Sequence, residues 1–277
     1  MAKKAFVIGD PVSHSRSPLI HGHWLAKHGV DGSYEAIHVK QDELGVFLAG
    51  LKKNGFAGGN VTVPHKEAVF AHAAQRDEIA EEIGAANTLW LEDGKLCATN
   101  TDSFGFAQNL DELAPGWDRI SSALVIGAGG ASRAVIHALK SRGVSDIRVA
   151  NRTRERAIEL RKAFGPKISA HGLEALGQLA EDVGLVVNTT SLGMKGEGAI
   201  PLDMARLPAN TLVTDIVYLP LETPFLKAAR HVGLRVADGL GMLLHQARPG
   251  FEKWFGVLPD VTPELRQLII ADMERPA

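Results

Sequence analysis

Cysteine is almost absent from this 277-residue sequence, which holds only Cys97. A single thiol excludes an internal disulfide and any metal site built on several cysteines. An excess of one charge is lacking too, because the formal net charge is −2 and the pI is near 6.6. Such a balance gives no field for nucleic acid or for acidic membrane surfaces. We therefore expect no nucleic-acid partner.

Long apolar runs are also missing, so no segment is expected to span a membrane. The apolar run that follows Met1 stops at Gly9-Asp-Pro11 and is too short for the core of a signal peptide. Internal repeats and low-complexity segments are not seen. These absences predict a cytoplasmic protein without a membrane partner. The sequence leaves both a monomer and a homodimer open.

What remains is an ordinary globular composition, 45% hydrophobic and 22% charged, in a chain long enough for two domains. Strand-like and helix-like segments alternate, which predicts an α/β fold with mostly parallel sheets. We expect a substrate-binding domain at 1–104, a Rossmann-type nucleotide-binding domain at 105–240, and helices at 241–277 that return to the first domain. The active site is expected in a cleft between the two domains.

A glycine-rich turn marks the start of the second domain. An apolar strand at 123–126 leads into Gly127, Gly129 and Gly130, and a helix and a second strand, 146–151, follow in order. This βαβ geometry lays a pyrophosphate on a helix N-terminus. Ser132 stands where the usual motif has its third glycine. The alternative is a tight turn that binds nothing.

The end of that second strand, Asn151-Arg-Thr-Arg-Glu-Arg156, favours one form of the cofactor. An NAD site places an acidic residue here for the ribose 2′-hydroxyl, and this chain has none at the strand tip. Guanidinium groups match a 2′-phosphate, so we predict NADP, with Arg152 as the main phosphate ligand and Arg156 one turn later. The alternative is a solvated helix start capped by Thr153.

Polar clusters in the first domain lie at predicted strand ends, where open α/β sheets bind ligands. They are 13–17, 60–66, and the pair Asn87 with Asp102. A lysine beside a carboxylate suits proton transfer to a secondary alcohol, which points to Lys66 and Asp102. Plainer alternatives stay open: Lys66 as a surface lysine, and Asp102 and Ser17 as helix N-caps. No metal site is expected.

These motifs together resemble the shikimate dehydrogenase family over nearly the whole chain. The segments that carry the resemblance are Gly9-Asp-Pro-Val-Ser-His-Ser-Arg-Ser-Pro18, Gly59-Asn-Val-Thr-Val-Pro-His-Lys66, Gly84-Ala-Ala-Asn-Thr-Leu89, Asn100-Thr-Asp102, Gly127-Ala-Gly-Gly130, Asn151-Arg-Thr153, Asn188-Thr-Thr-Ser-Leu-Gly-Met194, Asp215-Ile-Val-Tyr218 and Gly241-Met-Leu-Leu-His-Gln246.

The resemblance implies reversible, NADPH-dependent reduction of 3-dehydroshikimate to shikimate in aromatic amino-acid biosynthesis. It implies Lys66 and Asp102 as the catalytic pair. The implied substrate-binding residues are Ser15, Ser17, Thr62, Lys66, Asn87, Asp102, Tyr218 and Gln246. The implied NADP-binding residues are Gly127, Ala128, Gly129, Gly130, Ala131, Asn151, Arg152, Thr153, Arg156, Ile216 and Gly239.

Three other functions remain open at this stage: a quinate or dual quinate/shikimate dehydrogenase, a non-catalytic NADP-binding sensor, and a folate-type dehydrogenase of similar plan. The serine cluster argues against the last, because it suits a small carboxylate. Two departures from the family pattern are visible, Gly22 and the segment Arg248-Pro-Gly250. We expect the second to interrupt the final part of the helical tail.

Overall fold

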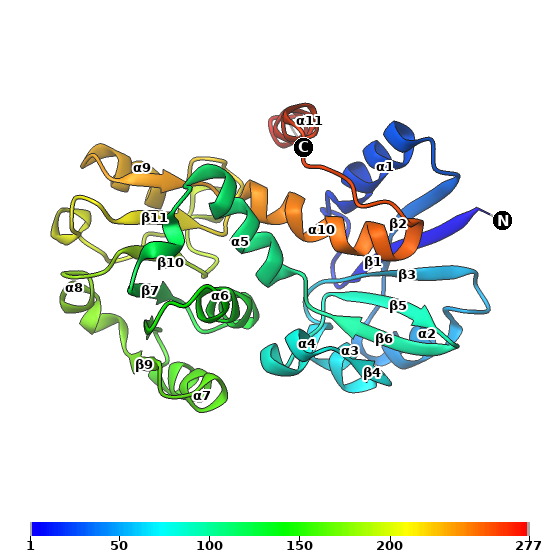
Figure 1. Cartoon of the computed structure of the whole chain (residues 1–277), viewed down its shortest axis with the longest axis horizontal. Helices are drawn as coiled ribbons and strands as arrows, with labels where there is room; N and C mark the ends of the chain where they lie inside the picture. Colours follow the sequence, from blue (N-terminus) through cyan, green and yellow to red (C-terminus); the bar gives the residue numbers. More distant parts are fainter. Residues whose placement is uncertain (1, 276–277) are drawn as a thin grey trace. The chain divides into compact units, whose positions relative to one another are not determined.

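The computed structural model describes residues 2–275. The chain divides into two compact units. The first unit contains the residues up to Thr101 together with those from Gln246 onward, and the second runs from Asp102 to His245. Each unit is built around its own six-stranded sheet, and each is described by itself (Figure 1).

The sheet of the first unit has the strand order β2-β1-β3-β5-β6-β4. Strand β1 lies parallel to both β2 and β3, whereas β5 and β6 form an antiparallel hairpin that turns at Asp93-Gly94, as the sequence predicts. Cys97 lies on β6 and is buried. The strands are β1 (Lys3–Gly9), β2 (Gly32–His38), β3 (Phe56–Val61), β4 (Gln75–Arg76), β5 (Thr88–Glu92) and β6 (Lys95–Thr99).

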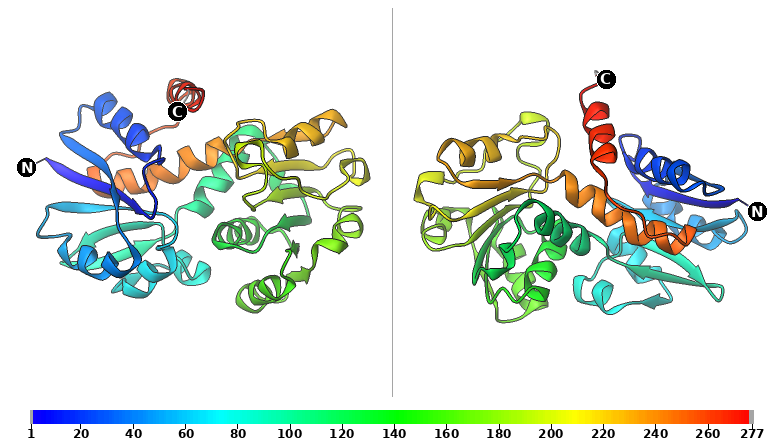
Figure 2. Two further views of the ribbon diagram at one scale, coloured as in Figure 1. Left: turned by 180° about the vertical axis from the view of Figure 1, so that it is seen from behind. Right: turned by 45° about the horizontal axis from the view of Figure 1, so that its top comes forward.

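Helices cover both faces of this first sheet. Leu44 and Leu48 of α2 and Val69 of α3 pack on one face, and an aromatic cluster from α1 and the end of α10 fills the other. Helix α11 lies beside α1 (Figure 2). The helices of this unit are α1 (Ser17–His28), α2 (Leu44–Gly50), α3 (Lys66–His72), α4 (Glu78–Ile83), the second half of α10 (Leu240–Phe255) and α11 (Pro263–Met273).

Helix α10 corrects one expectation, because it runs unbroken through Pro249. A proline inside a helix removes one backbone hydrogen bond and costs about 3 kcal/mol. The side chains that follow it, Phe251 and Trp254, are almost completely buried. The Trp254 indole also donates to the carbonyl of Leu89, at 2.7 Å. Burial of these two rings offsets the cost of the proline.

The start of α1 also differs from the alternative that Ser17 caps it. Arg16, not Ser17, occupies the N-cap of α1, and no side chain caps this helix. The Ser17 hydroxyl is engaged with Tyr34 instead. A 3-10 turn over Gln41–Glu43 precedes α2, and its N-cap is Lys40, whose N–H donates to the Glu43 carboxylate at 3.1 Å. The contact with Tyr34 therefore decides the start of α1, not the local preference of serine for a cap.

The sheet of the second unit is fully parallel in the order β12-β11-β10-β7-β8-β9, the arrangement predicted for a Rossmann-type half. Its central strands are buried throughout and mainly apolar, as expected for a parallel sheet between helices. The strands are β7 (Ser122–Ile126), β8 (Asp146–Ala150), β9 (Ile168–His171), β10 (Leu185–Asn188), β11 (Leu212–Asp215) and β12 (Arg235–Ala237).

The two faces of this parallel sheet carry different helices. One face packs against α5 (Asp102–Leu113), α6 (Gly130–Ser141) and α7 (Arg154–Phe164). The other packs against α8 (Leu176–Leu179), α9 (Pro224–His231) and the segment around Met204. Thr223 caps α9 by accepting from the Leu226 N–H, as the Thr-Pro pair predicts. Over residues 2–275 no helix is both long and apolar enough to cross a membrane.

Candidate active site

The glycine-rich turn of the second unit joins β7 to α6. Gly127 has a φ of +113°, and its N–H donates to the carbonyl of Ala150 at 2.8 Å. A Cβ on this residue would lie 2.6 Å from the Thr189 hydroxyl. Only glycine meets both demands, the positive φ and the close approach of the strand beside it. The first glycine of the motif is therefore fixed by the fold itself.

The next two glycines, Gly129 and Gly130, face open space. A Cβ on either would meet no heavy atom within 4 Å. They lie at the N-terminus of α6, where backbone N–H groups and the helix dipole favour an anion. Ser132, which replaces the usual third glycine, is fully buried and donates its hydroxyl to the carbonyl of Gly129 at 2.6 Å. This serine stabilises the turn, a role the sequence analysis missed.

The end of β8 presents the basic segment. The Asn151 amide donates to the carbonyl of Thr153 at 2.8 Å, so the two predicted residues lie together in the loop. Arg152, Arg154 and Arg156 are all exposed. Exposed guanidinium groups beside the glycine-rich βα unit keep their full donor sets for a phosphate.

Gly239 and Ile216 also lie together in the second unit. A Cβ on Gly239 would come within 2.7 Å of the Ile216 carbonyl, so the glycine permits this backbone approach. Next to Ile216, Asp215 is completely buried at the end of β11. Its carboxylate accepts hydrogen bonds from Asn188, Thr223 and the N–H of Val217.

Burial raises the pKa of Asp215 to about 6, although these three donors act in the opposite direction. Asp215 lies in one of the segments that carry the family resemblance, but the sequence alone gives it no role. Its hydrogen bonds join the strand ends of β10 and β11 to the start of α9, and so fix the loop that carries Ile216.

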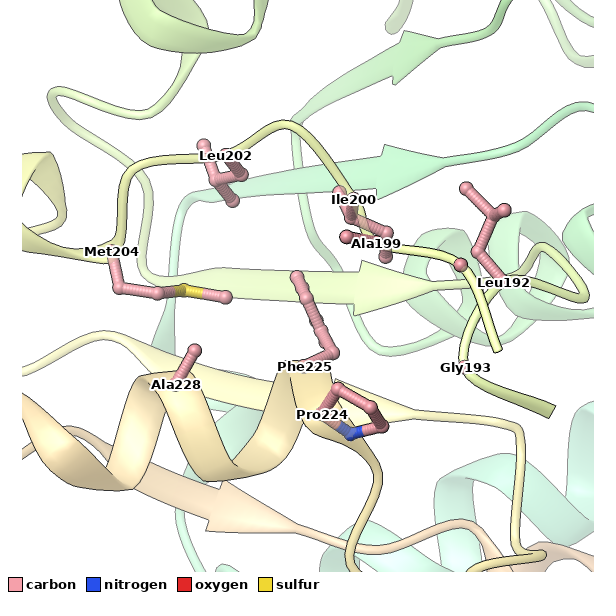
Figure 3. Close-up of a pocket in the computed structure, with 10 residues that line it drawn as sticks. Leu192, Gly193, Ala199, Ile200, Leu202, Met204, Pro224, Phe225 and Ala228 are labelled. Carbon is pink, nitrogen blue, oxygen red and sulfur yellow. The ribbon is translucent and has the colours of Figure 1, made fainter. Parts of the chain in front are cut away.

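The loop after β10 closes over a small apolar cavity (Figure 3). Leu192, Ile200 and Leu202 line one side, and Pro224 and Phe225 of α9 line the other. These side chains offer no hydrogen-bonding group, so the cavity supports the underside of the loop rather than a polar ligand.

The serine loop of the first unit leads from β1 into α1. The Ser17 N–H donates to the Ser15 hydroxyl oxygen at 3.3 Å, which brings these two predicted residues together. Arg16, between them, forms an ion pair with Asp272 of α11 at 3.1 Å. The C-terminal helix thus holds the loop in place from the outside.

Thr62 and Lys66 follow β3. The Thr62 N–H donates to the carbonyl of Ile8 and its own carbonyl accepts from His65, which forms the turn into α3. Lys66 is half-buried as the first residue of α3, and its carbonyl accepts from Ala86 at 3.0 Å. That last bond ties the lysine backbone to the segment that carries Asn87.

Asn87 and Gln246 lie together in the interior of the first unit, 2% and 8% exposed. The Asn87 Oδ1 accepts from the N–H of Thr101 at 2.8 Å and from the Thr88 hydroxyl at 2.9 Å. Its Nδ2 donates to the Gln246 Oε1 at 3.4 Å. The amide is therefore held with its donor side toward Gln246. Helix α10, which carries Gln246, continues through Pro249.

Asp102 and Tyr218 belong to the second unit. Asp102 is the first residue of α5 and is 9% exposed, and Tyr218 is half-buried after β11. The structure thus distributes the predicted substrate-binding residues over both units. Tyr34 and Asn60 contact several of them in the first unit and were not predicted as site residues.

A parallel second sheet with a glycine turn at its βα junction, an open helix N-terminus and a basic strand end defines the class: an α/β dehydrogenase with a Rossmann-type nucleotide-binding half. Three family models match the chain in order. They describe the shikimate dehydrogenase substrate binding domain at residues 7–89, shikimate / quinate 5-dehydrogenase at 117–194, and the shikimate 5′-dehydrogenase C-terminal domain at 239–268. The chain belongs to the shikimate dehydrogenase family.

Relatives and solved structures agree with this assignment. A shikimate dehydrogenase (NADP(+)) from Mesorhizobium japonicum is 64% identical, covering 98% of this chain and 97% of the relative. One from Rhizobium meliloti is 58% identical over 99% and 96%. The Thermus thermophilus shikimate 5-dehydrogenase in complex with NADP(H) and shikimate matches with a TM-score of 0.87 at 37% identity, over 98% and 99%. A quinate dehydrogenase from Corynebacterium glutamicum in complex with NAD matches with a TM-score of 0.90 at 30% identity, over 98% and 99%.

Proposed function

We propose that this protein is an NADP-dependent shikimate dehydrogenase, which reversibly reduces 3-dehydroshikimate to shikimate in aromatic amino-acid biosynthesis. This proposal rests mainly on the nucleotide-binding half. Its glycine turn leaves open space at the N-terminus of α6, and β8 ends in exposed arginines without an acidic residue at the strand tip. Relatives named for this activity at 58% and 64% identity support the substrate.

NADP would be held by the second unit. The open space above Gly129 and Gly130 fits a pyrophosphate, and the exposed Arg152 fits the 2′-phosphate. When bound, the cofactor exchanges a hydride with the substrate carbon. The full proposed set is Gly127, Ala128, Gly129, Gly130, Ala131, Asn151, Arg152, Thr153, Arg156, Ile216 and Gly239.

The substrate would be held mainly by the first unit. Ser15 and Ser17, with Tyr218, are proposed to bind its carboxylate, because hydroxyl groups donate to an anion without adding charge. Thr62, Asn87 and Gln246 are proposed to bind the ring hydroxyls. The buried and hydrogen-bonded Asn87 supports this role, since its Nδ2 is already fixed as a donor.

Lys66 and Asp102 are proposed to be the catalytic pair for proton transfer. In shikimate oxidation the hydroxyl proton would pass to Lys66 in its neutral amine form, while the carbon–hydrogen electron pair would leave as hydride to the bound NADP⁺. In the reverse direction Lys66 returns that proton to the new alkoxide oxygen. Asp102 is proposed to be the second member of the catalytic pair and to bind the substrate. Removing such a proton-transfer group typically costs 10²–10⁴-fold in rate.

The first experiment measures NADP⁺ reduction with shikimate, through NADPH absorbance, in the wild type, Lys66→Ala and a control, Lys53→Ala. Lys53 is exposed, lies in the same unit and belongs to neither proposed binding set. We expect Lys66→Ala to lower kcat by about 10²–10⁴-fold while NADP⁺ still binds, and Lys53→Ala to match the wild type. Equal rates in all three proteins would contradict the role of Lys66.

The same assay with quinate and with NAD⁺ tests the nearest alternative. The arginine-rich strand end favours NADP, and the match to a quinate dehydrogenase is at only 30% identity. We expect shikimate with NADP⁺ to be the preferred pair. Faster turnover of quinate with NAD⁺ would overturn the proposal, and binding of NADP⁺ without any turnover would favour the sensor alternative. We further propose a cytoplasmic protein, either monomeric or homodimeric.

A further inference from the structure

Tyr34 is a buried side chain of the first unit that reaches across its sheet. It lies on β2, and its neighbour on β1 is Ala5, whose small side chain leaves room above the strand. The ring of His21 stacks on it, with centroids 3.9 Å apart and planes 14° from parallel. This packing fixes the ring, so that the tyrosine hydroxyl is delivered to one place near β3.

That hydroxyl has two partners, one on each side. It donates to the Asn60 Oδ1 at 2.6 Å, and it accepts from the Ser17 hydroxyl at the start of α1. Asn60 is fixed in turn, because its Nδ2 donates to the carbonyl of Asn87 at 3.2 Å and to the Thr88 hydroxyl at 3.1 Å. The register of β3 with β5, which places Asn60 opposite Thr88, makes these contacts possible.

The chain of hydrogen bonds therefore runs from Ser17 through Tyr34 to Asn60, and from there to the Asn87 backbone carbonyl and, through the Thr88 hydroxyl, to the Asn87 side-chain Oδ1. The carbonyl of Asn87 accepts only, so the Asn60 Nδ2 must face it and the Asn60 Oδ1 must face Tyr34. The tyrosine hydroxyl donates to this oxygen over a short distance in the interior of the unit. A buried acceptor that loses a donor costs more than an average hydrogen bond contributes.

The groups around Tyr34 hold their protonation states over the physiological range. Burial raises the pKa of Tyr34 well above its ordinary value, so the hydroxyl keeps its proton and remains a donor. Burial lowers the pKa of His21 to about 3, so the stacked ring is neutral. The Tyr34 hydroxyl consequently remains the donor to the Asn60 Oδ1, and the ring stacked on it carries no charge.

We propose that Tyr34 is a positioning residue for substrate binding, which holds Ser17 and, through Asn60 and the Thr88 hydroxyl, the Asn87 amide in the orientation that a ligand meets. This inference rests on the proposed function, since it assumes that Ser17 and Asn87 bind the substrate. A carboxylate arriving at Ser17 finds the oxygen already placed, and only the hydroxyl proton has to turn toward it. At Asn87 the ligand finds an amide whose donor side is fixed.

The test is Tyr34→Phe, which removes the hydroxyl and keeps the ring that stacks on His21. Steady-state kinetics are measured with shikimate varied at saturating NADP⁺ and then with NADP⁺ varied. We expect KM for shikimate to rise about three- to tenfold, the equivalent of one buried hydrogen bond, with kcat changed less than about twofold. KM for NADP⁺ should not change, because the cofactor-binding turn belongs to the second unit.

Thr211→Val is the matched control. It also removes one buried hydroxyl, whose hydrogen bond to the Val183 carbonyl is 2.8 Å long, but it lies in the second unit outside both proposed binding sets. Both variants should unfold at a somewhat lower temperature, and only Tyr34→Phe should raise KM for shikimate. An unchanged KM in Tyr34→Phe, or a rise equal to that in Thr211→Val, would overturn the inference. Absent turnover in the wild type would instead reject the proposed function.

Discussion

The two units form their proposed binding surfaces in opposite ways. In the second unit the surface is backbone: a glycine turn, a helix N-terminus and a strand end, with Gly127 fixed by its φ of +113° and by Thr189. In the first unit the surface is side chain, because amides and hydroxyls such as Asn87 are held by further buried side chains. The backbone surface depends on the absence of a Cβ, and the side-chain surface depends on retaining every hydrogen-bonding atom.

The difference teaches where each unit is vulnerable. A single added methyl group is expected to damage the second unit's surface, whereas the first unit is expected to tolerate changes of shape better than the loss of one polar atom. The units differ in charge as well. The buried network of the first unit consists of neutral amides and hydroxyls, while the second unit buries the carboxylate of Asp215.

The largest expected effect comes from adding one methyl group to the glycine turn. Gly127→Ala places a Cβ at an unfavourable φ and 2.6 Å from the Thr189 hydroxyl, and strain of this kind costs about 1–3 kcal/mol before the clash is counted. We expect a clear fall in melting temperature together with loss of NADP⁺ binding, measured by calorimetry.

Gly129→Ala is the partner experiment, since its Cβ meets no heavy atom within 4 Å. Its stability should stay within about 0.5 kcal/mol of the wild type, while NADP⁺ binding weakens because the methyl group occupies the space proposed for the pyrophosphate. Equal loss of stability in both variants would break the distinction between a glycine required by the fold and one required by the ligand.

A second prediction concerns the buried charge of the second unit. The folded-state pKa of Asp215, about 6, lies above the ordinary aspartate value of 3.8. Below both values the proton is bound in both states and the group has no effect. As the pH rises from about 4 to 6 the unfolded chain releases its proton first, so the free energy of unfolding falls, by up to about 3 kcal/mol at 1.4 kcal/mol for each pKa unit. Above pH 6 the destabilisation by Asp215 no longer changes with pH.

Asp215→Asn should remove this slope, so that its unfolding free energy relative to the wild type increases between pH 4 and pH 7 in chemical denaturation. Asp182→Asn is a control of opposite sign. The hydrogen bond from Arg148 lowers the pKa of Asp182, so its contribution is present at neutral pH and is lost as the pH falls. A relative stability of Asp215→Asn that does not vary with pH would show that burial does not raise the pKa of this carboxylate.

The smallest expected effect tests the strand end beside the glycine turn. Arg152→Ala should raise KM for NADP⁺ about tenfold, consistent with the loss of one charge-assisted hydrogen bond at an exposed site, and should leave KM for NAD⁺ unchanged. Arg154→Ala, two residues further along, is the matched control and should change neither value. A rise in KM for both cofactors would mean that Arg152 does not bind the 2′-phosphate.

Sequence patterns predicted the regular parts of the fold. The βαβ unit around Gly127, the hairpin at Asp93-Gly94 and the Thr223 cap all depend on residues close in sequence, and each is confirmed. The expected Ser17 cap and the break at Pro249 were wrong, because contacts with Tyr34 and the burial of Phe251 and Trp254 outweigh local preference.

The supporting residues of the candidate site lay beyond the reach of the sequence. Tyr34 meets Asn60 only because β1 lies between β2 and β3, and nothing local to either residue indicates that strand order. Asp215 looked like an ordinary strand end until its complete burial was known. The residues proposed to touch ligand were found through motifs, whereas those that hold them in place required the three-dimensional arrangement.

The solitary Cys97 gives the first unit a built-in reporter. Its thiol is 1% exposed on β6, burial raises its pKa, and no second cysteine exists elsewhere in the sequence. A thiol-specific reagent should therefore modify the native protein only when this unit opens. The labelling rate then measures the opening of the first unit alone, because the second unit has no thiol. For each substitution above, a faster labelling rate would show that the first unit has been destabilised.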